Sequence, residues 1–231
     1  MHRIELPADI RARVLKRYGT LHVHSDLNPT STALIVVDLQ NAFMVEELAA
    51  VYVPQAVEIV PNVNRLADAV RRSGGKVCFL RHTHTKEILE SWQNYFDLGS
   101  SESRKQRLAR SERLSEGDVG HELHPSLMVA PEDKQVCKTR FSAFIHDSSN
   151  LHEILQQDGI DTLLIAGAVS NVCCESTARD AMMLNYKVIM ISDANAALSD
   201  DEHIAALANI YNTFGDVMTT DETIMALQGK T

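Results

Sequence analysis

Cys173 is the residue of this sequence best placed to act as a nucleophile. It follows the apolar run 162–165 and a Gly-Ala-Val-Ser-Asn-Val turn, and it opens a stretch of small residues with helical character. Backbone N–H groups and the positive end of a helix dipole meet at such a turn, and both favour a thiolate over a thiol. We therefore expect the sulfur of Cys173 to attack a carbonyl carbon. The backbone N–H groups of Val169 and Cys173 would stabilise the oxyanion that forms.

Two other ionisable residues end apolar runs in the same way. Asp38 closes the apolar run 33–37, and Lys138 closes a short expected strand at 135–137. If these runs are parallel strands, their carboxyl ends lie together at one edge of the sheet, where ligands bind. Asp38 would then take the thiol proton and later deliver it to a leaving amine. Lys138 would hold Asp38 ionised and favour the thiolate. These three groups together point to covalent acyl transfer.

Each of these residue types also has a common structural role. An isolated Cys is often a buried small hydrophobe, an Asp after a strand often caps a helix, and a loop Lys is usually solvated. We assign Cys78 and Cys137, which lie within apolar runs, to the core. Because one step along a helix rotates the side chain by about 100°, only one of two adjacent cysteines can face a pocket, and we assign Cys174 to helix packing.

Six apolar runs alternate with helical patterns along the chain. The runs expected to form strands are 33–37, 76–80, 135–137, 162–165, 187–191 and 216–218. Between the first two, apolar residues at 63, 66, 67 and 70 follow the i, i+3, i+4, i+7 spacing of an amphipathic helix. Such alternation predicts an α/β fold: a doubly wound, six-stranded, mainly parallel sheet with helices on both faces.

The remaining segments are less regular. Residues 7–18 predict a short helix ended by Gly19, within an N-terminal helical extension of residues 1–30 that precedes one domain, 31–231. Ser199 and Glu202 have the spacing of a capping box. The segment 81–127 has no clear period, and an insertion of this length is usually functional or an interface.

Charge and composition exclude several classes of function. The 231 residues carry a formal net charge of -9, which argues against a nucleic-acid or anionic-membrane surface. No run approaches the ~20 apolar residues of a membrane span, and the N-terminus lacks the apolar core of a signal peptide. We expect a cytoplasmic protein with a small-molecule substrate, no cofactor and no metal, assembled as a homo-oligomer (a dimer or a tetramer).

Three segments carry a resemblance to a known family. Residues 33–43 around Asp38, 138–144 after Lys138 and 167–181 around Cys173 resemble motifs of the isochorismatase-like cysteine hydrolases. With the closing segment 214–220, the resemblance covers about residues 31–225. It implies an Asp–Lys–Cys triad that hydrolyses an amide-type C–N bond through a thioester. It also implies a cis peptide bond before Val169 that aims the Val169 N–H into an oxyanion hole.

The same resemblance bears on the substrate. The true isochorismatases of the family lack the cysteine and cleave a vinyl ether, so Cys173 favours the amidohydrolase branch. The surroundings of Cys173 look most like those of ureidoacrylate, biuret and N-carbamoyl amidohydrolases, whose substrates are small, polar and often acidic. By position, the expected pocket residues are Asn41, Phe43, Arg81, His82, Trp92, Tyr95 and Phe144. Packing between subunits is an equal alternative for Trp92, Tyr95 and the neighbouring Phe96.

Metal binding and two rival functions remain as alternatives. Nicotinamidases of the family hold a metal with an Asp and several His after the second strand, whereas this chain has only His82 and His84 there. Two candidate ligands are fewer than a metal normally needs. His121 and His124 are not an HExxH zinc pattern, and we place them at the surface. The rival functions are a nicotinamidase or other small-amide hydrolase with the same triad, and a non-catalytic binding protein.

Overall fold

A six-stranded sheet forms the centre of the structure, a computed structural model that describes residues 1–229. The strands are β1 (Thr32–Val37), β2 (Lys76–His82), β3 (Lys134–Lys138), β4 (Thr162–Ala168), β5 (Lys187–Ala196) and β6 (Asp216–Met218). Their order is β3-β2-β1-β4-β5-β6, and every pairing is parallel. The predicted fold class is therefore confirmed. The order reverses between β1 and β4, which makes their carboxyl ends the expected ligand site.

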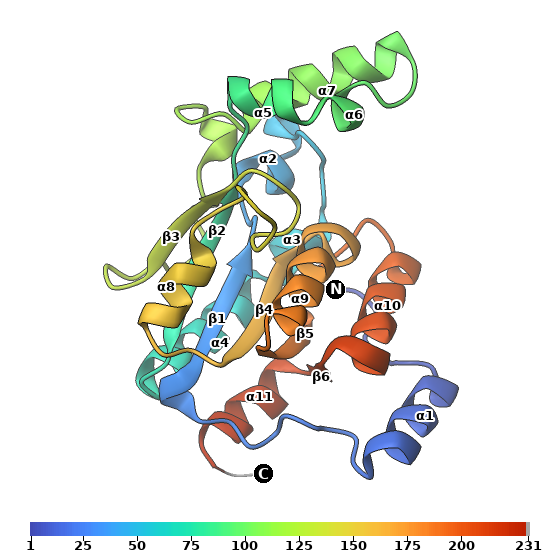
Figure 1. Cartoon of the computed structure of the whole chain (residues 1–231), viewed down its shortest axis with the longest axis vertical. Coiled ribbons are helices and arrows are strands. Elements are labelled where there is room, and N and C mark those ends of the chain that lie inside the picture. Colours follow the sequence, from blue (N-terminus) through green and yellow to red (C-terminus); the bar gives the residue numbers. More distant parts are fainter. Residues whose placement is uncertain (230–231) are drawn as a thin grey trace.

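Helices cover both faces of this sheet (Figure 1). On one face lie α8 (Leu151–Gln157), α9 (Glu175–Met183) and α10 (Asp200–Asn209), and on the other α4 (Val60–Arg72) and α11 (Thr220–Leu227). The remaining helices are α1 (Ala8–Tyr18), α2 (Asn41–Met44), α3 (Gln55–Glu58), α5 (Lys86–Ser91), α6 (Gln93–Phe96) and α7 (Ser101–Arg113). The residues predicted to end the domain at 231 lie partly outside the described range.

The alternation of side chains along β1 divides the core into two layers. Ala33, Ile35 and Val37 pack with apolar residues of α8, α9 and α10, whereas Leu34 and Val36 pack with those of α4 and α11. All six residues of β1 are buried, because helices cover both faces. This double burial explains why the strand reads as an unbroken apolar run.

Gly167 is required where β4 passes β1 at this switch point. Its φ is +123°, and an added Cβ would stand 2.1 Å from the carbonyl oxygen of Val37. Only a residue without a side chain permits both the backbone conformation and the approach. The glycine thereby brings the chain after β4 close to the end of β1, where Asp38 follows.

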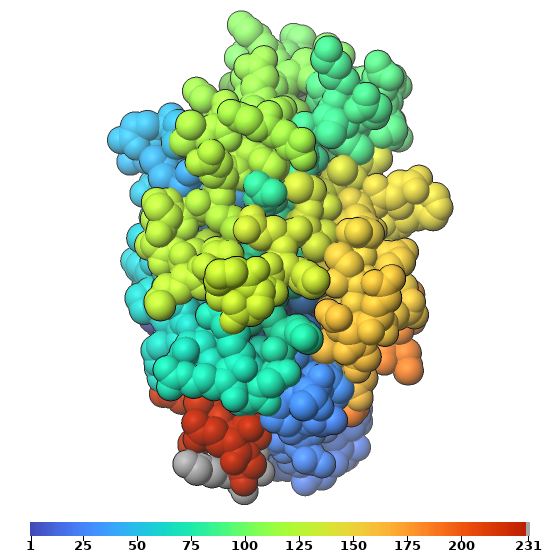
Figure 2. All heavy atoms as spheres, turned by 90° about the vertical axis from the view of Figure 1, so that its left-hand side faces the viewer, coloured from blue at the N-terminus to red at the C-terminus, as the bar shows by residue number. Residues whose placement is uncertain are grey.

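The segment 81–127 is not irregular, contrary to the sequence-based prediction. It folds into α5, α6, α7 and a 3-10 turn at Val119–His121, which lie above the carboxyl ends of the strands (Figure 1). Thr85 and Ser100 cap α5 and α7 by accepting hydrogen bonds from backbone N–H groups. Because α7 is polar on nearly all sides, it has no apolar period to detect. Seen from the side, these helices (green) occupy the end of the molecule opposite α11 (Figure 2).

The ends of three helices compare differently with the predictions from sequence. Helix α1 ends as predicted, at Gly19 in the left-handed conformation. Ser199 caps α10, but its hydroxyl donates to the Glu202 carboxylate, and the complete capping box lies at Thr219 and Glu222, at the start of the unpredicted α11. Within residues 1–229, no helix has both the length and the apolar character needed to cross a membrane.

Candidate active site

Asp38 and Lys138 form a buried ion pair at the carboxyl edge of the sheet. The Lys138 Nζ lies 2.7 Å from Asp38 Oδ2, and neither residue is exposed. Asp38 follows β1 directly, in the left-handed backbone region that Asp tolerates (φ +51°), and its N–H donates to the carbonyl oxygen of Leu80. Lys138 is the last residue of β3. The register of three parallel strands thus sets the distance between the two charges.

Cys173 reaches the same place from a short π-helical turn, Ser170–Cys174, between β4 and α9. The peptide bond Ala168–Val169 is cis. Ser170 holds the turn in place: its hydroxyl pairs with His203 Nδ1 at 2.8 Å, while His203 Nε2 donates to the carbonyl oxygen of Ser192 at 3.0 Å. Since a carbonyl only accepts, His203 carries its proton on Nε2, and its Nδ1 accepts from Ser170.

The charges of the site follow from burial and from the ion pair. Burial raises the pKa of Asp38 above the ordinary carboxyl value, and the charge of Lys138 opposes that rise. Burial opposes the charged form of Lys138 too, but Asp38 and Cys173 together outweigh it and raise the pKa of Lys138. The pair therefore rests as ammonium and carboxylate.

Burial also raises the pKa of the Cys173 thiol, with Lys138 acting in the opposite direction. This burial outweighs the helix end that was expected to favour a thiolate, so the resting group is the thiol. A thiol in this position could act as a nucleophile only if its proton passed to a nearby base at the same time. Asp38 is a base with a raised pKa close to that thiol, and its Oδ1 has no hydrogen-bond partner among residues 1–229.

A cavity of about 230 Å³ opens beside Cys173. Of the residues expected in the pocket, Phe43, His82 and Tyr95 line it, as do Val169 and Cys173 themselves. The rest of its lining comes from Ala50, Val51, His84, Arg107, Arg110, Leu114, Phe141, Asn171, Val172, Leu198 and Glu202. One side is aromatic, and α7 supplies two guanidinium groups.

Four residues expected in this pocket lie elsewhere. Asn41 donates to the carbonyl oxygen of Val119 and so holds a loop. Arg81 precedes His82 on β2, and since side chains alternate along a strand it faces the other way. Trp92 does not line the cavity but stacks on Tyr95, which does, with ring centroids 4.3 Å apart. Phe144 packs on Tyr186, 5.7 Å between ring centroids.

Phe141, Arg107 and Arg110 also line the cavity, although the sequence did not lead us to expect them there. Phe141 stands three residues before Phe144, and it packs at 4.9 Å from Trp92, edge to face. Arg107 and Arg110 come from α7, and they stand three apart, so they lie on neighbouring turns of one helix face. Only the two arginines had a signal in the sequence, because they lie in a charge-rich run. Such a run is more often a solvated surface than part of a pocket, so it did not predict their position.

His82 and His84 turn toward each other rather than toward a metal position. Their Nε2 atoms are 3.0 Å apart, and His84 Nδ1 lies 2.9 Å from the hydroxyl of Ser111. Asp38, His82 and Cys173 do present one donor atom each within 4.8 Å of one another. However, the Lys138 ammonium already pairs with that carboxylate at 2.7 Å. These residues do not fit a metal centre, and we assign none.

Two predictions about other residues are wrong. His121, expected at the surface, is 2% exposed, because the turn at Val119–His121 folds it against Thr83, whose hydroxyl lies 2.7 Å from its Nε2. Cys137, expected in the core, is only half-buried, since β3 is an edge strand. Cys78 and Cys174 are buried in the core as predicted.

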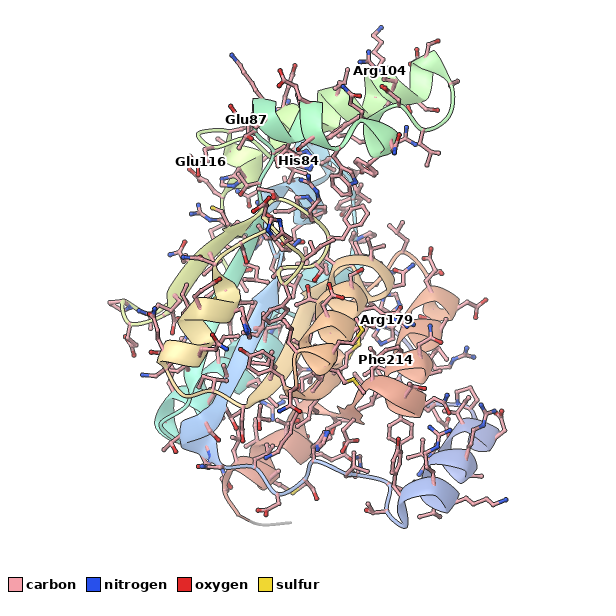
Figure 3. The ribbon with its side chains drawn as sticks, in the orientation of Figure 1. His84, Glu87, Arg104, Glu116, Arg179 and Phe214 are labelled. Carbon is pink, nitrogen blue, oxygen red and sulfur yellow. The ribbon has the colours of Figure 1, made fainter. Side chains whose placement is uncertain are left out.

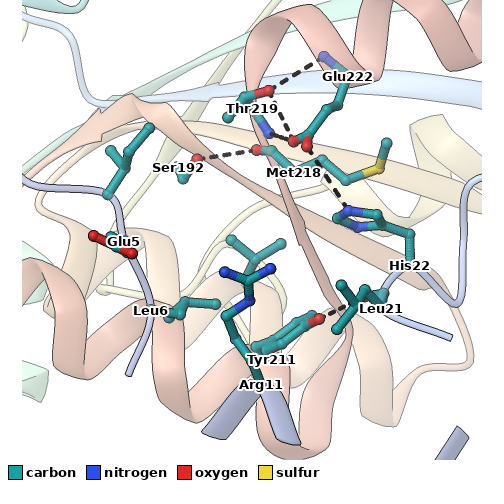
Figure 4. A pocket seen from close by; sticks show the side chains of 12 residues that line it. Glu5, Leu6, Arg11, Leu21, His22, Ser192, Tyr211, Met218, Thr219 and Glu222 are labelled. Carbon is teal, nitrogen blue, oxygen red and sulfur yellow. Dashed lines mark hydrogen bonds and ion pairs between the residues drawn. The ribbon is translucent and has the colours of Figure 1, made fainter. Parts of the chain in front are cut away.

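A second cavity, of about 250 Å³, lies between the N-terminal segment and the β5–β6 edge of the sheet (Figure 4). Glu5, Arg11, His22 and Glu222 bring charge to it. None of Asp38, Lys138 and Cys173 lines it. Among its lining residues there is no cysteine and no lysine, so the combination of groups at the carboxyl edge of the sheet is not repeated there.

Comparison with known proteins finds one family. The isochorismatase domain profile matches residues 32–222. Ureidoacrylate amidohydrolase RutB of Rhizobium rhizogenes is 31% identical over 206 residues, which are 85% of this chain and 83% of that protein. A probable inactive nicotinamidase of Arabidopsis thaliana is 37% identical over 188 residues, 79% of this chain and 89% of its own. A crystal structure of a cysteine hydrolase from Pseudomonas syringae pv. phaseolicola superposes with a TM-score of 0.75 at 30% identity, covering 89% of this chain and 96% of that one.

Proposed function

This chain belongs to the isochorismatase family of hydrolytic enzymes, and on that basis we propose that it hydrolyses a C–N bond (amide, ureido or carbamoyl) of a small polar substrate through a thioester on Cys173. The observation that carries this proposal is the buried ion pair of Lys138 and Asp38, 2.7 Å between charged atoms, beside the cavity that Cys173 lines. It supplies a base next to the thiol in a place that water reaches poorly.

Acylation begins when the Cys173 sulfur attacks the substrate carbonyl carbon. The thiol proton passes to Asp38, and the carbonyl oxygen becomes an oxyanion that the backbone N–H groups of Val169 and Cys173 stabilise. As the tetrahedral intermediate collapses, Asp38 returns the proton to the leaving nitrogen and the C–N bond breaks. The products of this half are a free amine or ammonia and a thioester on Cys173.

Deacylation repeats these steps with water in place of the thiol. Asp38, again a carboxylate, takes a proton from water, and the hydroxide oxygen bonds to the thioester carbonyl carbon. Collapse breaks the C–S bond, and the proton on Asp38 returns to the sulfur. Throughout, Lys138 remains an ammonium: it offsets the negative charge that moves between Asp38 and the thiol, in surroundings where burial penalises that charge.

The cavity favours a small anion as the substrate. Arg107 and Arg110 bring two positive charges to one wall, against one carboxylate, that of Glu202, whose own oxygen is engaged by the Ser199 hydroxyl. Arg110 has no ion-pair partner among residues 1–229. Guanidinium groups pair well with carboxylates. A ureido acid, the type of compound for which the RutB relatives are named, carries both the scissile C–N bond and such a carboxylate.

Nicotinamide is the second candidate, because one relative is named a probable inactive nicotinamidase. The aromatic side of the cavity, Phe43, Tyr95 and Phe141, is the observation that favours it, since a flat ring stacks well on such a wall. The two candidates differ in charge: nicotinamide is neutral and would not need the arginines of α7.

Release of ammonia from ureido acids, biuret and nicotinamide, compared between the wild-type protein and Cys173→Ala, tests the proposal. We expect wild-type hydrolysis of a carboxylate-bearing ureido substrate and none by the variant. Preference for nicotinamide would replace the first candidate by the second. If Cys173→Ala retains the wild-type rate on every compound that the protein hydrolyses, the thioester mechanism is wrong.

A further inference from the structure

One buried side chain, His82, touches all three members of the proposed triad and has no part in the mechanism described above. Its Nδ1 lies 3.4 Å from Lys138 Nζ, 3.8 Å from Asp38 Oδ2 and 3.9 Å from Cys173 Sγ. The residue is 3% exposed. It is the last residue of β2, the strand that lies between β1 and β3, so the sheet order itself puts it between Asp38 and Lys138.

The proton of this imidazole can be assigned from its partners. Burial lowers the pKa of His82 well below its ordinary value, and the charge of Lys138 lowers it further, so the ring is neutral. An ammonium group only donates hydrogen bonds, so Nδ1 of His82 must face Lys138 with its lone pair. Its proton is then on Nε2, directed at Nε2 of His84.

This contact completes the surroundings of Lys138. An ammonium has three N–H donors, and three oxygen or nitrogen acceptors surround Lys138: Asp38 Oδ2 at 2.7 Å, the carbonyl oxygen of Arg140 at 3.2 Å and His82 Nδ1 at 3.4 Å. With all three directions taken, the ammonium cannot rotate away from Asp38 without losing a partner.

The chain of hydrogen bonds continues from His82 into the inserted helices. His84 Nε2 accepts a hydrogen bond from the Nε2–H of His82. The proton of His84 is therefore on Nδ1, which donates to the Ser111 hydroxyl at 2.9 Å. Burial lowers the pKa of His84 to about 4, which keeps this ring neutral as well. Ser111 lies on α7, the helix that carries Arg107 and Arg110. Figure 3 shows His84 beneath these helices, between them and the sheet.

We propose that His82 is a positioning residue of the triad: its neutral imidazole holds the Lys138 ammonium against Asp38, and His84 and Ser111 of α7 fix the orientation of that imidazole. The inference rests on the proposed function for its catalytic consequence. His82 also joins two parts of the site that are far apart in the sequence. Through His84 and Ser111 it connects α7, which lines the cavity with two arginines, to the Lys138 ammonium, which sets the basicity of Asp38.

Two pairs of variants test this role. For each variant we measure kcat and KM on whichever substrate the wild-type protein hydrolyses. We also measure, by mass spectrometry, how alkylation of Cys173 by iodoacetamide depends on pH. His82→Leu removes the acceptor for Lys138. His82→Asn keeps one, because the Asn Oδ1 stands where Nδ1 stood. His84→Leu and His84→Gln form the same kind of pair one step further out. His152→Asn is the matched control outside the site, because His152 lies on α8 and forms a hydrogen bond with Tyr186.

With His82→Leu, we expect Asp38 to lose part of the support that keeps it ionised, so the acid limb of the alkylation profile moves up by about 0.5–1 pH unit. We also expect kcat to fall by at least about tenfold, because the loss concerns alignment of the ion pair, and this fall to exceed any change in KM that comes from the place of His82 in the cavity lining. His82→Asn and His84→Gln should restore most of both quantities. His84→Leu should shift them in the same direction as His82→Leu, by less.

A folded His82→Leu protein with wild-type kcat and an unmoved acid limb would overturn the proposal, as would a His82→Asn protein no better than His82→Leu. Should His82→Leu fail to fold, the His84 pair decides in the same terms: equal behaviour of His84→Leu and the wild type contradicts the proposal. If the wild-type protein hydrolyses no substrate tested, the proposed function fails. The alkylation profile still decides the role of His82, since it needs no substrate.

Discussion

Gln40 holds the backbone of His82 on both sides: its Oε1 accepts from the His82 N–H at 2.7 Å, and its Nε2 donates to the His82 carbonyl oxygen at 3.1 Å. Gln40 is fully buried and stands two residues after Asp38. The end of β1 is therefore locked to the end of β2 at the point where both enter the site. Its Nε2 also donates to the carbonyl oxygen of His121 at 2.9 Å, so the turn at Val119–His121 joins the same arrangement.

The buried ion pair gives a prediction that separates stability from activity. Lys138→Met leaves Asp38 buried without its partner, and removal of one member of such a pair costs about 3–5 kcal/mol. The double variant Asp38→Asn/Lys138→Met removes the isolated charge, so we expect it to regain most of the lost Tm. Neither protein should hydrolyse substrate at more than about 1% of the wild-type rate, since general-base catalysis is lost. Thermal unfolding and ammonia release measure the two effects, and a Lys138→Met protein as stable as the wild type would contradict the account.

The twin cysteines give a second prediction. Cys174 is fully buried among the apolar residues that pack α9 against the sheet, and it does not line the cavity. Cys174→Ala should cost about 1 kcal/mol of stability, the usual scale for a small cavity in a core, and keep most of the activity. Cys173→Ala should remove the activity. Parallel assays of the two variants test the assignment, and the reverse outcome would make Cys174 the nucleophile.

A third prediction concerns the charge of the substrate. Arg110→Gln should raise KM for a carboxylate-bearing substrate by about tenfold, the value of one charge-assisted hydrogen bond. For a neutral amide it should change KM little. Arg104→Gln is the control, because Arg104 lies on the same helix but pairs with Asp97 away from the cavity (Figure 3). Equal effects of the two substitutions would argue against a carboxylate at this wall.

The second cavity supplies a prediction about pH. The hydrogen bond to buried Asp216 raises the pKa of His22, although burial opposes the charged form. A raised pKa means that the folded protein binds the proton more tightly than the unfolded one. The stabilisation is therefore complete below the unfolded value near pH 6.5 and is lost as the pH rises through the folded value. The contact between His22 and Asp216 thus holds the N-terminal segment against β6.

His22→Asn keeps a neutral donor near Asp216 and removes the charge. We expect its Tm to lie below that of the wild type at about pH 5.5 and to approach it at about pH 9, on either side of the titration. His146→Asn, an exposed position beside Asp147, is the control. A Tm difference independent of pH would show that the charge of His22 contributes nothing to stability.

Much of the fold was predictable because its signals are local. β1 reads as an apolar run since helices bury both its faces, and β6 lies at the residues predicted. Helix α7 escaped prediction because a polar helix above the sheet edge has no apolar stripe. β5 continues to Ala196, five residues beyond the predicted run, through polar positions that form part of the ladder only with β4.

The candidate site was predictable only in part, for a different reason. That Asp38, Lys138 and Cys173 meet follows from strand ends in a parallel sheet. The position of His82 among them depends on the pairing of β2 with both neighbours, which no local pattern reveals. Phe141 rather than Phe144 faces the cavity because the chain after Lys138 bends irregularly, so side-chain directions there have no period.

The central claim is that the sulfur of Cys173 carries the acyl group of the substrate during turnover. Mass spectrometry of the protein quenched in acid during steady-state hydrolysis tests it most directly. We predict an added mass equal to the acyl fragment, located at Cys173, that disappears as substrate is exhausted and never forms on Cys173→Ala. Hydrolysis that proceeds with no adduct at Cys173, or with the adduct on Cys174, would contradict the account.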